Sequence, residues 1–295
     1  FCYNNHLIVT SASGSNNWRS FSIDEENKIF TPEFKKTESQ IKDTLFQNPV
    51  RKNVLGGFYF KAEETEVYPT GIISYPSGGA NSSFNRTQMV WDSSGTYLIN
   101  VANKTSGVDV LKLIENADSS FAYELVQTID TSALEGNTRT HSFAPGDNHT
   151  PNSFCLFGRY IYTIDPATNA LHFQDINQIP LPVQGVVLLY GKNYLVLKSD
   201  DTSKNPTITF LKATKIDDTL QEQAFFENIS NYEFEVIHQD SYQNVPTKPL
   251  SHAYGGYFSS INNVKDYFIR PLKESISSIE DFDFCFEREA SLSSD

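Results

Sequence analysis

One segment of the chain gathers most of the side chains that could do acid–base or anion-binding chemistry. Residues 139–149 contain Arg139, His141, Asp147 and His149, which bring two imidazoles, a carboxylate and a guanidinium within eleven positions. Such a set could bind an anion, supply a general base or ligate a metal. The Pro-Gly pair between the histidines predicts a turn that brings His141 close to His149. The alternative is a polar loop with exposed histidines.

Other catalytic signatures are absent from the sequence. It has no Gly-x-Ser-x-Gly elbow, no His-Glu-x-x-His motif, no P-loop and no dinucleotide-binding glycine motif. Cys2, Cys155 and Cys285 lie far apart, which argues against a zinc site and a dense disulfide framework. We expect no metal and no cofactor. The three cysteines are expected to act as small buried hydrophobic residues, and one disulfide plus a free thiol is the alternative.

An intracellular compartment, cytoplasm or nucleus, is favoured over secretion.

Composition limits the class of protein and the partners that the chain can bind. The 295 residues are 39% hydrophobic and 20% charged, which predicts a soluble globular chain with a packed core. Asp and Glu number 36 against 23 Lys and Arg, giving a net charge of −13. Nucleic acid is therefore not an expected partner, whereas a protein with a basic patch is. No apolar run approaches the roughly 20 residues of a membrane span.

Short runs of alternating apolar and polar residues, separated by turn residues, dominate the chain. The clearest pair is 96–102 and 108–114. The five residues at 103–107 between them include Asn, Ser and Gly, which tolerate turn conformations. The sequence therefore predicts a β-hairpin, in which Asp109 separates the apolar positions Val108 and Val110.

This strand pattern repeats along the chain. Each unit has an apolar inner strand, a small polar turn, an aromatic-aliphatic middle strand, a loop and a third alternating strand. Such units lie at 1–24, 89–114, 154–176, 187–212 and, in degraded form, 255–286. His172 alternates with Leu171 and Phe173 in one predicted third strand, so we expect it to face outward. Helix is expected only at 38–46 and 271–279, and the chain is predicted to be all-β.

The repeat length predicts the architecture. A unit of roughly 45 residues fits a four-stranded propeller blade, and 295 residues make six or seven such blades. We predict one domain over residues 1–290, a single β-propeller of six or seven blades, followed by a polar tail at 291–295. A β-sandwich or another two-sheet β domain is the alternative, because one sequence does not show ring closure.

Two segments resemble the blades of a known superfamily. Residues 90–104 read Val-Trp-Asp-Ser-Ser-Gly-Thr-Tyr-Leu-Ile-Asn-Val-Ala-Asn-Lys and continue into the strand at 108–113, and residues 158–169 are similar. This pattern resembles the blades of YVTN/lactonase-like and WD40-like β-propellers, over about a third of the chain. The Trp-Asp and Gly-His signatures of WD40 repeats are lacking, since Trp91-Asp92 opens a turn instead of ending a strand. The resemblance implies a fold superfamily and no individual protein.

Three functions are compatible with these observations. The leading hypothesis is a non-catalytic platform for a protein or peptide partner, with Arg139, His141, Asp147 and His149 as candidate binding residues. The resemblance implies a rival, a lactonase- or cyclase-like hydrolase of a small anionic ring ester, with His141 or His149 as acid–base and Arg139 holding a carboxylate. The third is an extracellular recognition domain, suggested by five Asn-x-Ser/Thr sequons. They start at Asn81, Asn85, Asn103, Asn148 and Asn228.

Overall fold

The structure is a computed structural model. It describes residues 2–3, 6–10, 17–24, 26–27, 29–37, 54–55, 58–62, 67–82, 86–91, 96–101, 107–117, 121–134, 152–199, 207–241, 257–259 and 266–285. The chain divides into two compact units: unit 1 comprises Phe1–Met89 and Gly95–Ala133, and unit 2 comprises Val90–Ser94 and Leu134–Asp295. The single domain over 1–290 stays a prediction, and the tail at 291–295 lies outside the described residues. No helix in the described part of the chain has the length and apolar character that crossing a bilayer requires.

The described elements are β-strands and four single-turn 3-10 helices, so the chain is all-β as predicted. The first part of the chain forms β1 Cys2–Tyr3, β2 His6–Thr10, β3 Asn17–Asp24, β4 Ile29–Thr37, β5 Val54–Leu55, β6 Phe58–Ala62, β7 Val67–Ile72, β8 Arg86–Trp91, β9 Thr96–Val101, β10 Val108–Glu115, β11 Phe121–Ile129 and η1 Thr131–Ala133. The remainder forms β12 Ser153–Leu156, β13 Tyr160–Ile164, β14 Leu171–Asp175, η2 Ile176–Gln178, β15 Val186–Gly191, β16 Tyr194–Lys198, β17 Thr207–Lys215, η3 Ile229–Asn231, β18 Tyr232–Ser241, β19 Tyr257–Ser259, β20 Asp266–Pro271, η4 Ile279–Asp281 and β21 Phe282–Cys285.

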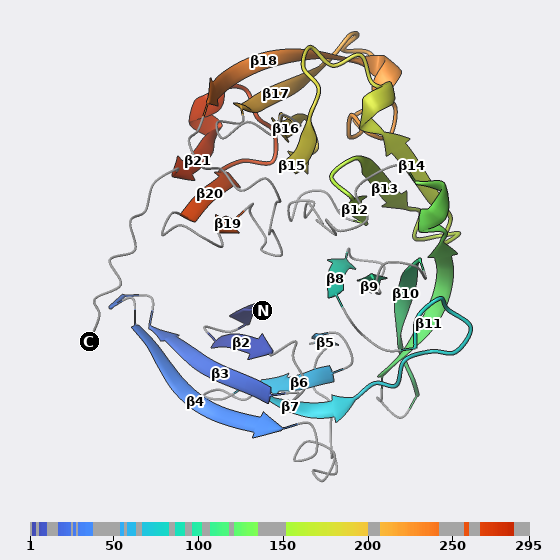
Figure 1. Cartoon of the computed structure of the whole chain (residues 1–295), viewed down its shortest axis with the longest axis vertical. Helices are drawn as coiled ribbons and strands as arrows, with labels where there is room; N and C mark the ends of the chain where they lie inside the picture. Colours follow the sequence, from blue (N-terminus) through green and yellow to red (C-terminus); the bar gives the residue numbers. More distant parts are fainter. Residues whose placement is uncertain are drawn as a thin grey trace. The chain divides into compact units, whose positions relative to one another are not determined.

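These strands form sheets in which neighbours in space are neighbours in sequence (Figure 1). We name them in chain order: sheet I (β1–β4), sheet II (β5–β7), sheet III (β8–β11), sheet IV (β12–β14), sheet V (β15–β18) and sheet VI (β19–β21). Pairs with a described register are antiparallel, so each sheet is a meander built from local hairpins. The predicted hairpin at 96–114 is confirmed, with Val101 opposite Val108.

The repeat motif locates three strands of each unit, and sheets I, III and V also carry the fourth strand that the repeat length allows: β4, β11 and β18. One sequence-based expectation differs from the structure. The helix expected at 271–279 is wrong: only the single turn η4 forms there, at Ile279–Asp281. The backbone N–H of Ile276 donates to the Asn193 side chain at 2.8 Å, so it is not used for a helical bond. The helix expected at 38–46 lies outside the described residues.

In unit 1, one face of sheet III packs against the segment that follows β7. Its core joins Ile73 to side chains of β9, β10 and β11, namely Leu98, Leu111, Leu113, Phe121 and Tyr123. Burial is graded across the sheet. The described side chains of β9 are fully buried, whereas those of β11 alternate between buried and accessible positions. The last strand of the sheet therefore provides its solvent edge.

In unit 2, sheet V lies between sheets IV and VI (Figure 1). On one face, Val187, Leu195, Leu197 and Leu211 pack with Cys155, Ile161 and Ile176 of sheet IV and its connection. On the other, Leu189, Val196 and Phe210 pack with Ile269, Ile276 and Phe282 of sheet VI and its connection. All five residues of β16 are buried, while most of β18 is exposed. Burial on both faces explains why β15 and β16 read as continuous apolar runs without alternation.

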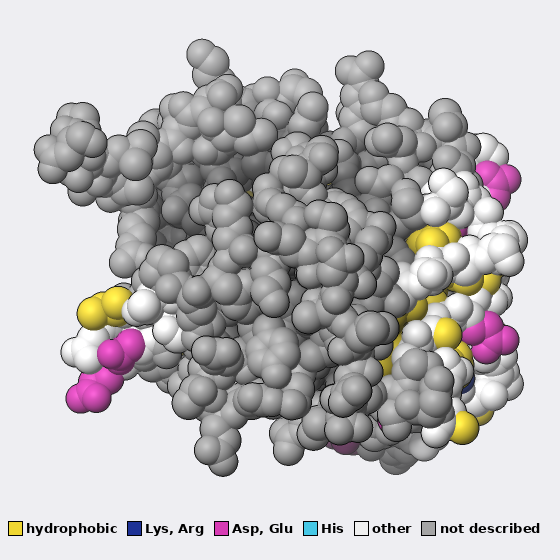
Figure 2. Space-filling model, turned by 90° about the horizontal axis from the view of Figure 1, so that it is seen from below, with side chains coloured by type: hydrophobic (Ala, Val, Ile, Leu, Met, Phe, Trp, Pro, Cys, Tyr) yellow, Lys and Arg dark blue, Asp and Glu magenta, His cyan; other side chains and the backbone are white. Residues whose placement is uncertain are grey.

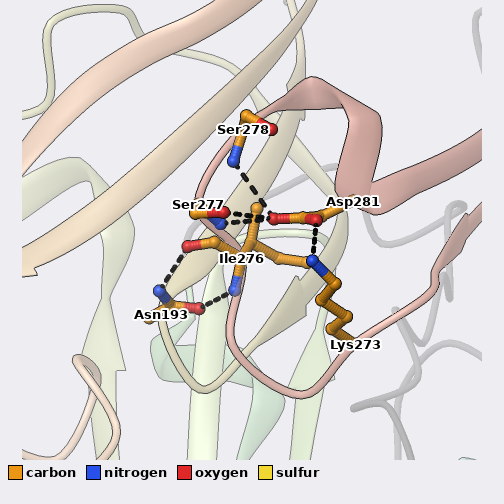
Figure 3. Close-up of polar contacts among 6 residues, drawn as sticks. All are labelled: Asn193, Lys273, Ile276, Ser277, Ser278 and Asp281. Atoms are coloured by element: carbon orange, nitrogen blue, oxygen red, sulfur yellow. Dashed lines mark hydrogen bonds and ion pairs between the residues drawn. The ribbon is translucent and has the colours of Figure 1, made fainter.

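A side-chain clamp joins sheets V and VI (Figure 3). Asn193, in the turn between β15 and β16, donates from Nδ2 to the carbonyl of Ile276 and accepts from its backbone N–H, both at 2.8 Å. These two bonds satisfy the backbone carbonyl and N–H of Ile276, which lies 83 residues away in sequence, as hydrogen bonds from a neighbouring strand would. The asparagine side chain suits this role because its amide offers a donor and an acceptor side by side.

A glycine turn makes the corresponding junction between sheets IV and V. Phe157 and Gly158, between β12 and β13, have φ of 57° and 63°, the positive values that suit tight hairpin turns. The carbonyl of Gly158 accepts the backbone N–H of Val187 at 2.7 Å. A Cβ atom on Gly158 would lie 2.3 Å from Val186 Cγ1, so the two sheets meet where only glycine fits.

We expect Gly158→Ala to lower the free energy of unfolding by roughly 2–4 kcal/mol, because it adds a steric clash to an unfavourable φ. Gly78→Ala is the control. Gly78 also has a positive φ, 92°, but its added Cβ would meet only Leu125 Cδ2 at 3.9 Å, so a loss of about 1 kcal/mol is expected. Urea denaturation measures both. Equal losses would contradict the close approach of sheets IV and V.

Candidate functional site

The predicted site residues Arg139, His141, Asp147 and His149 lie outside the described residues. Their roles, and the hydrolase that they would serve, stay predictions. His172 is described: it lies on β14, opposite Thr163 of β13, and its side chain is exposed as expected. It borders the cavity described next.

A half-open cavity of about 460 Å³ lies in unit 2, within the volume range of small-ligand sites. Sheet IV provides most of its wall and the connection between β17 and η3 provides the rest. Its lining residues are Asn152, Ile161, Thr163, Ile164, Asp165, Pro166, His172, Phe173, Gln174, Phe226 and Glu227. Apolar and polar side chains are mixed, and Asp165 and Glu227 are the carboxylates among them.

The turn between β13 and β14 fixes the position of Asp165. Its Oδ1 accepts the backbone N–H of Ala167 at 2.9 Å, and its Oδ2 accepts the hydroxyl of Thr168 at 2.6 Å. Asn169 completes the turn with a φ of 58°, a conformation that asparagine tolerates. The Thr168 and Ala167 hydrogen bonds hold the pKa of Asp165 below its usual value, so its charge persists at neutral pH.

An aromatic stack lies on the face of sheet IV opposite to the face that carries Thr163, His172 and Gln174. Phe154 stacks on Tyr162 at 5.1 Å between centroids, and Tyr162 stacks on Phe173 at 5.4 Å. The three residues come from successive strands of sheet IV, and burial falls along the row. Phe154 is fully buried, Tyr162 nearly so, and Phe173 is 58% exposed. Burial raises the pKa of Tyr162 to about 12, so the stack carries no charge at its centre.

Two adjacent phenylalanines hold the connection between β17 and η3 in place beside the cavity, and the rest of that connection is largely polar. Phe225 is fully buried and its backbone N–H donates to the carbonyl of Lys192 at 3.0 Å. Phe226 packs edge-to-face on Tyr190 of β15 at 5.7 Å. Because these rings anchor the segment, the next side chain, Glu227, is held at the cavity with its carboxylate exposed.

Several polar side chains of the cavity form no hydrogen bond or ion pair with the rest of the described residues, unlike the other polar clusters. Among the described residues, the side chains of Thr163, His172 and Glu227 form no hydrogen bond or ion pair. Gln174 donates from Nε2 to the carbonyl of Asp175 at 3.0 Å, which leaves its amide oxygen as an acceptor. A ligand could therefore bind to the Thr163 hydroxyl and the Glu227 carboxylate without displacing a hydrogen bond to another described residue.

Asp109 of unit 1 shows the contrasting situation. It is fully buried on β10, and its carboxylate accepts from the hydroxyls of Tyr75 and Thr128 at 2.6 Å, from the backbone of Ala80 at 2.9 Å, and from the backbone and side chain of Asn81 at 3.0 and 2.9 Å. Burial opposes its ionisation, but the hydrogen bonds outweigh burial and lower the pKa of Asp109. The sequon at Asn81 is therefore engaged: its amide nitrogen, where a glycan would attach, donates to this carboxylate.

Two carboxylates of unit 2 are also fully engaged. Asp175 pairs with Arg159 through two 2.7 Å bonds, and the guanidinium holds the pKa of Asp175 below its usual value. Asp281 accepts from Lys273 at 2.5 Å and from Ser277 and Ser278 (Figure 3), which hold its pKa well below the usual range. Both residues stabilise the connections that follow or precede a strand, and neither is available for acid–base chemistry.

The described residues do not form a metal centre. Asp165, His172 and Glu227 line the same cavity, but in the described ranges no three Asp, Glu, His or Cys side chains are arranged to hold a metal ion. The described thiol, Cys155, is free and fully buried, and burial raises its pKa, so it is the small apolar core residue that we expected.

Sequence reasoning missed Glu227 and Phe226. One signal was present: the pair Phe225-Phe226 stands between Gln223 and Glu227 in a polar connection, where an apolar pair indicates an anchored segment. Sequence reasoning also gave Asp109 no special role. Its burial follows from the segment at residues 73–82, which covers this face of sheet III through Tyr75, Ala80 and Asn81.

We expect Asp109→Asn to lower the free energy of unfolding by roughly 2–4 kcal/mol, because the backbone N–H groups of Ala80 and Asn81 would then face an amide that donates as well as accepts. Asp130→Asn, on an exposed carboxylate of the same unit, is the control and should change stability by less than about 0.5 kcal/mol. Denaturant titration compares the two. Matching losses would show that the Asp109 contacts are not structural.

The same variants test the pH dependence. The pKa of Asp109 is lower in the folded than in the unfolded state, so its contribution is fully present above the unfolded value of about 4 and disappears as pH falls through the folded value. The stability difference between the wild type and Asp109→Asn should therefore shrink as pH is lowered below about 4. Urea midpoints at a series of pH values measure it; a difference that grows on acidification would contradict the sign.

Three comparisons with known proteins leave the chain without a match. No model of a protein family, no curated protein and no solved structure matches it.

Proposed function

We propose that the chain is a non-catalytic binding platform of the β-propeller type, which holds a protein or peptide partner. The single observation that carries the binding role is the cavity at sheet IV, because the side chains of Thr163 and Glu227 in its lining form no hydrogen bond or ion pair with other described residues. The buried carboxylates of Asp109, Asp175 and Asp281 instead accept hydrogen bonds from groups inside the protein.

The arrangement of unit 2 supports a propeller over a two-sheet sandwich. In a sandwich each sheet keeps one face toward solvent. The inner strands of sheet V instead pack on sheet IV through one face and on sheet VI through the other, and these are the sheets before and after it in the chain. Stacking of successive meanders is how blades pack, and a count of six described sheets is compatible with the proposed six blades.

Charge supports a basic partner. The chain carries a net charge of −13, and the described lining of the cavity includes Asp165 and Glu227 but no lysine or arginine. Figure 2 shows acidic side chains, in magenta, standing out on the described part of one face. An acidic surface accelerates encounter with a basic partner and disfavours nucleic acid.

A matched series of peptides that differ only in net charge tests this proposal. We expect binding to rise with positive charge and to weaken severalfold between about 50 mM and about 500 mM salt, because exposed charge pairs are screened over that range. Fluorescence anisotropy on the full chain measures it. Absence of binding at low salt for every peptide, or affinity that ignores peptide charge, would overturn the proposal.

A further inference from the structure

We propose that β14, the outer strand of sheet IV, binds an extended segment of a partner as a fourth, antiparallel strand. This inference rests on the proposed binding platform and assigns the place where the partner lies and the conformation in which it binds. Three features of sheet IV support it: the position left for a fourth strand, the backbone groups of β14, and the different chemistry of its two faces.

Sheet IV ends one strand earlier than the sheets before and after it in the chain. Sheets I, III and V each have a fourth strand, whereas β14 is the last strand of sheet IV among the described residues (Figure 1). Residues 152–199 are described without a gap, and after β14 the chain turns into the core, where Ile176 and Ile179 are buried. Pro180 and Pro182 follow, and proline cannot donate to a strand ladder. The chain therefore supplies no fourth strand between β14 and β15.

The backbone of β14 turns every second residue toward this open side. The backbone N–H of Asp165 donates to the carbonyl of Ala170 at 2.9 Å, at the end of the β13–β14 ladder. Because hydrogen-bonded and non-hydrogen-bonded pairs alternate in an antiparallel ladder, Leu171 and Phe173 fall in non-hydrogen-bonded pairs with β13. Their N–H and C=O groups point away from β13 and form no hydrogen bond with other described residues. Such groups are a template for pairing with another strand.

The sequence of β14 lacks the features that protect other outer strands. β4 contains a proline and two lysines, and β18 contains three acidic residues. Prolines and charged side chains on an outer strand discourage pairing with another chain. β14 reads Leu-His-Phe-Gln-Asp, and its one carboxylate, Asp175, is paired with Arg159 at 2.7 Å. The strand itself therefore presents no unpaired carboxylate that would oppose a partner strand.

The two faces of β14 select different side chains on the partner. Leu171 and Phe173 lie on one face, where Phe173 is 58% exposed. His172 and Gln174 lie on the other face, beside the cavity that the exposed carboxylate of Glu227 also lines. Directly opposite residues of an antiparallel pair share a face, so apolar partner residues would lie beside Phe173 and basic ones on the side of Glu227. The expected partner is an extended segment in which apolar and basic residues alternate.

A fluorescently labelled peptide with the sequence Lys-Val-Lys-Phe-Lys-Val-Lys has this alternation and serves as the probe. In the antiparallel pair, the N–H groups of its apolar residues point at β14 and those of its lysines point away. We expect N-methylation of the phenylalanine to weaken binding at least about tenfold, and N-methylation of a neighbouring lysine to weaken it by less than about twofold. Fluorescence anisotropy on the full chain measures both. Equal effects at the two positions would overturn the inference.

Amide hydrogen exchange resolved by NMR reports on β14 itself. In the free chain, Leu171 and Phe173 should exchange faster than His172 and Gln174, whose N–H groups point toward β13. Saturation with the peptide should slow Leu171 and Phe173 at least about tenfold and leave the amides of β18 unchanged. Slow exchange of Phe173 in the free chain, or exchange that the peptide does not change, would overturn the inference.

Matched substitutions locate the binding strand. Phe173→Thr should weaken the peptide a few-fold, because threonine keeps the preference for a strand but removes the exposed ring. Val236→Thr is the control, at an exposed apolar position of the outer strand β18, and should leave affinity unchanged. If the two variants bind the peptide equally well, β14 is not the binding strand.

The two proposals fail in different ways. If basic peptides bind with the expected dependence on charge but N-methylation has the same effect at both kinds of position, the strand site is overturned while the platform stands. If the probe shows the expected N-methylation pattern but affinity ignores peptide charge, the strand site is supported and only the preference for a basic partner fails. If no peptide binds at low salt, both proposals are overturned.

Discussion

The inner strands of sheet V have no face toward solvent, and the rest of unit 2 depends on this constraint. Their side chains pack on sheet IV in one direction and on sheet VI in the other, each buried aliphatic residue contributing about 1.5–3 kcal/mol. Sheet V therefore needs both neighbours. The contacts between the sheets show how closely they approach. At the junction of sheets IV and V there is no room for a Cβ atom on Gly158. At the junction of sheets V and VI, the Asn193 side chain forms the hydrogen bonds with Ile276 that a neighbouring strand would otherwise form.

The same constraint separates polar groups that build the fold from polar groups that can bind. A buried carboxylate is tolerated only when donors surround it, and Asp109, Asp175 and Asp281 all meet that condition. They resemble catalytic residues in their lowered pKa values, yet nothing in their surroundings leaves an oxygen for a substrate. The polar side chains of the cavity show the opposite: Glu227 is exposed, and Thr163 and His172 form no hydrogen bond or ion pair with other described residues.

Much of the fold could be predicted from local pattern, and the site could not. Hairpins such as β9–β10 and β15–β16 follow from apolar runs around turn residues, which are interactions between sequence neighbours. The repeat length allowed a fourth strand, but its position could not be identified, because an exposed edge strand such as β18 has little apolar periodicity. Glu227 meets sheet IV only through packing of Phe225 and Phe226, and Asp109 is buried only by a segment about 30 residues earlier, so neither could be read from its own surroundings.

Amide hydrogen exchange of sheet V tests the central claim, that its inner strands are buried between two sheets and its last strand faces solvent. The account predicts the slowest exchange in β16 and β17 and markedly faster exchange in β18, following the burial of each strand. Equal protection across the four strands, or the strongest protection in β18, would contradict it.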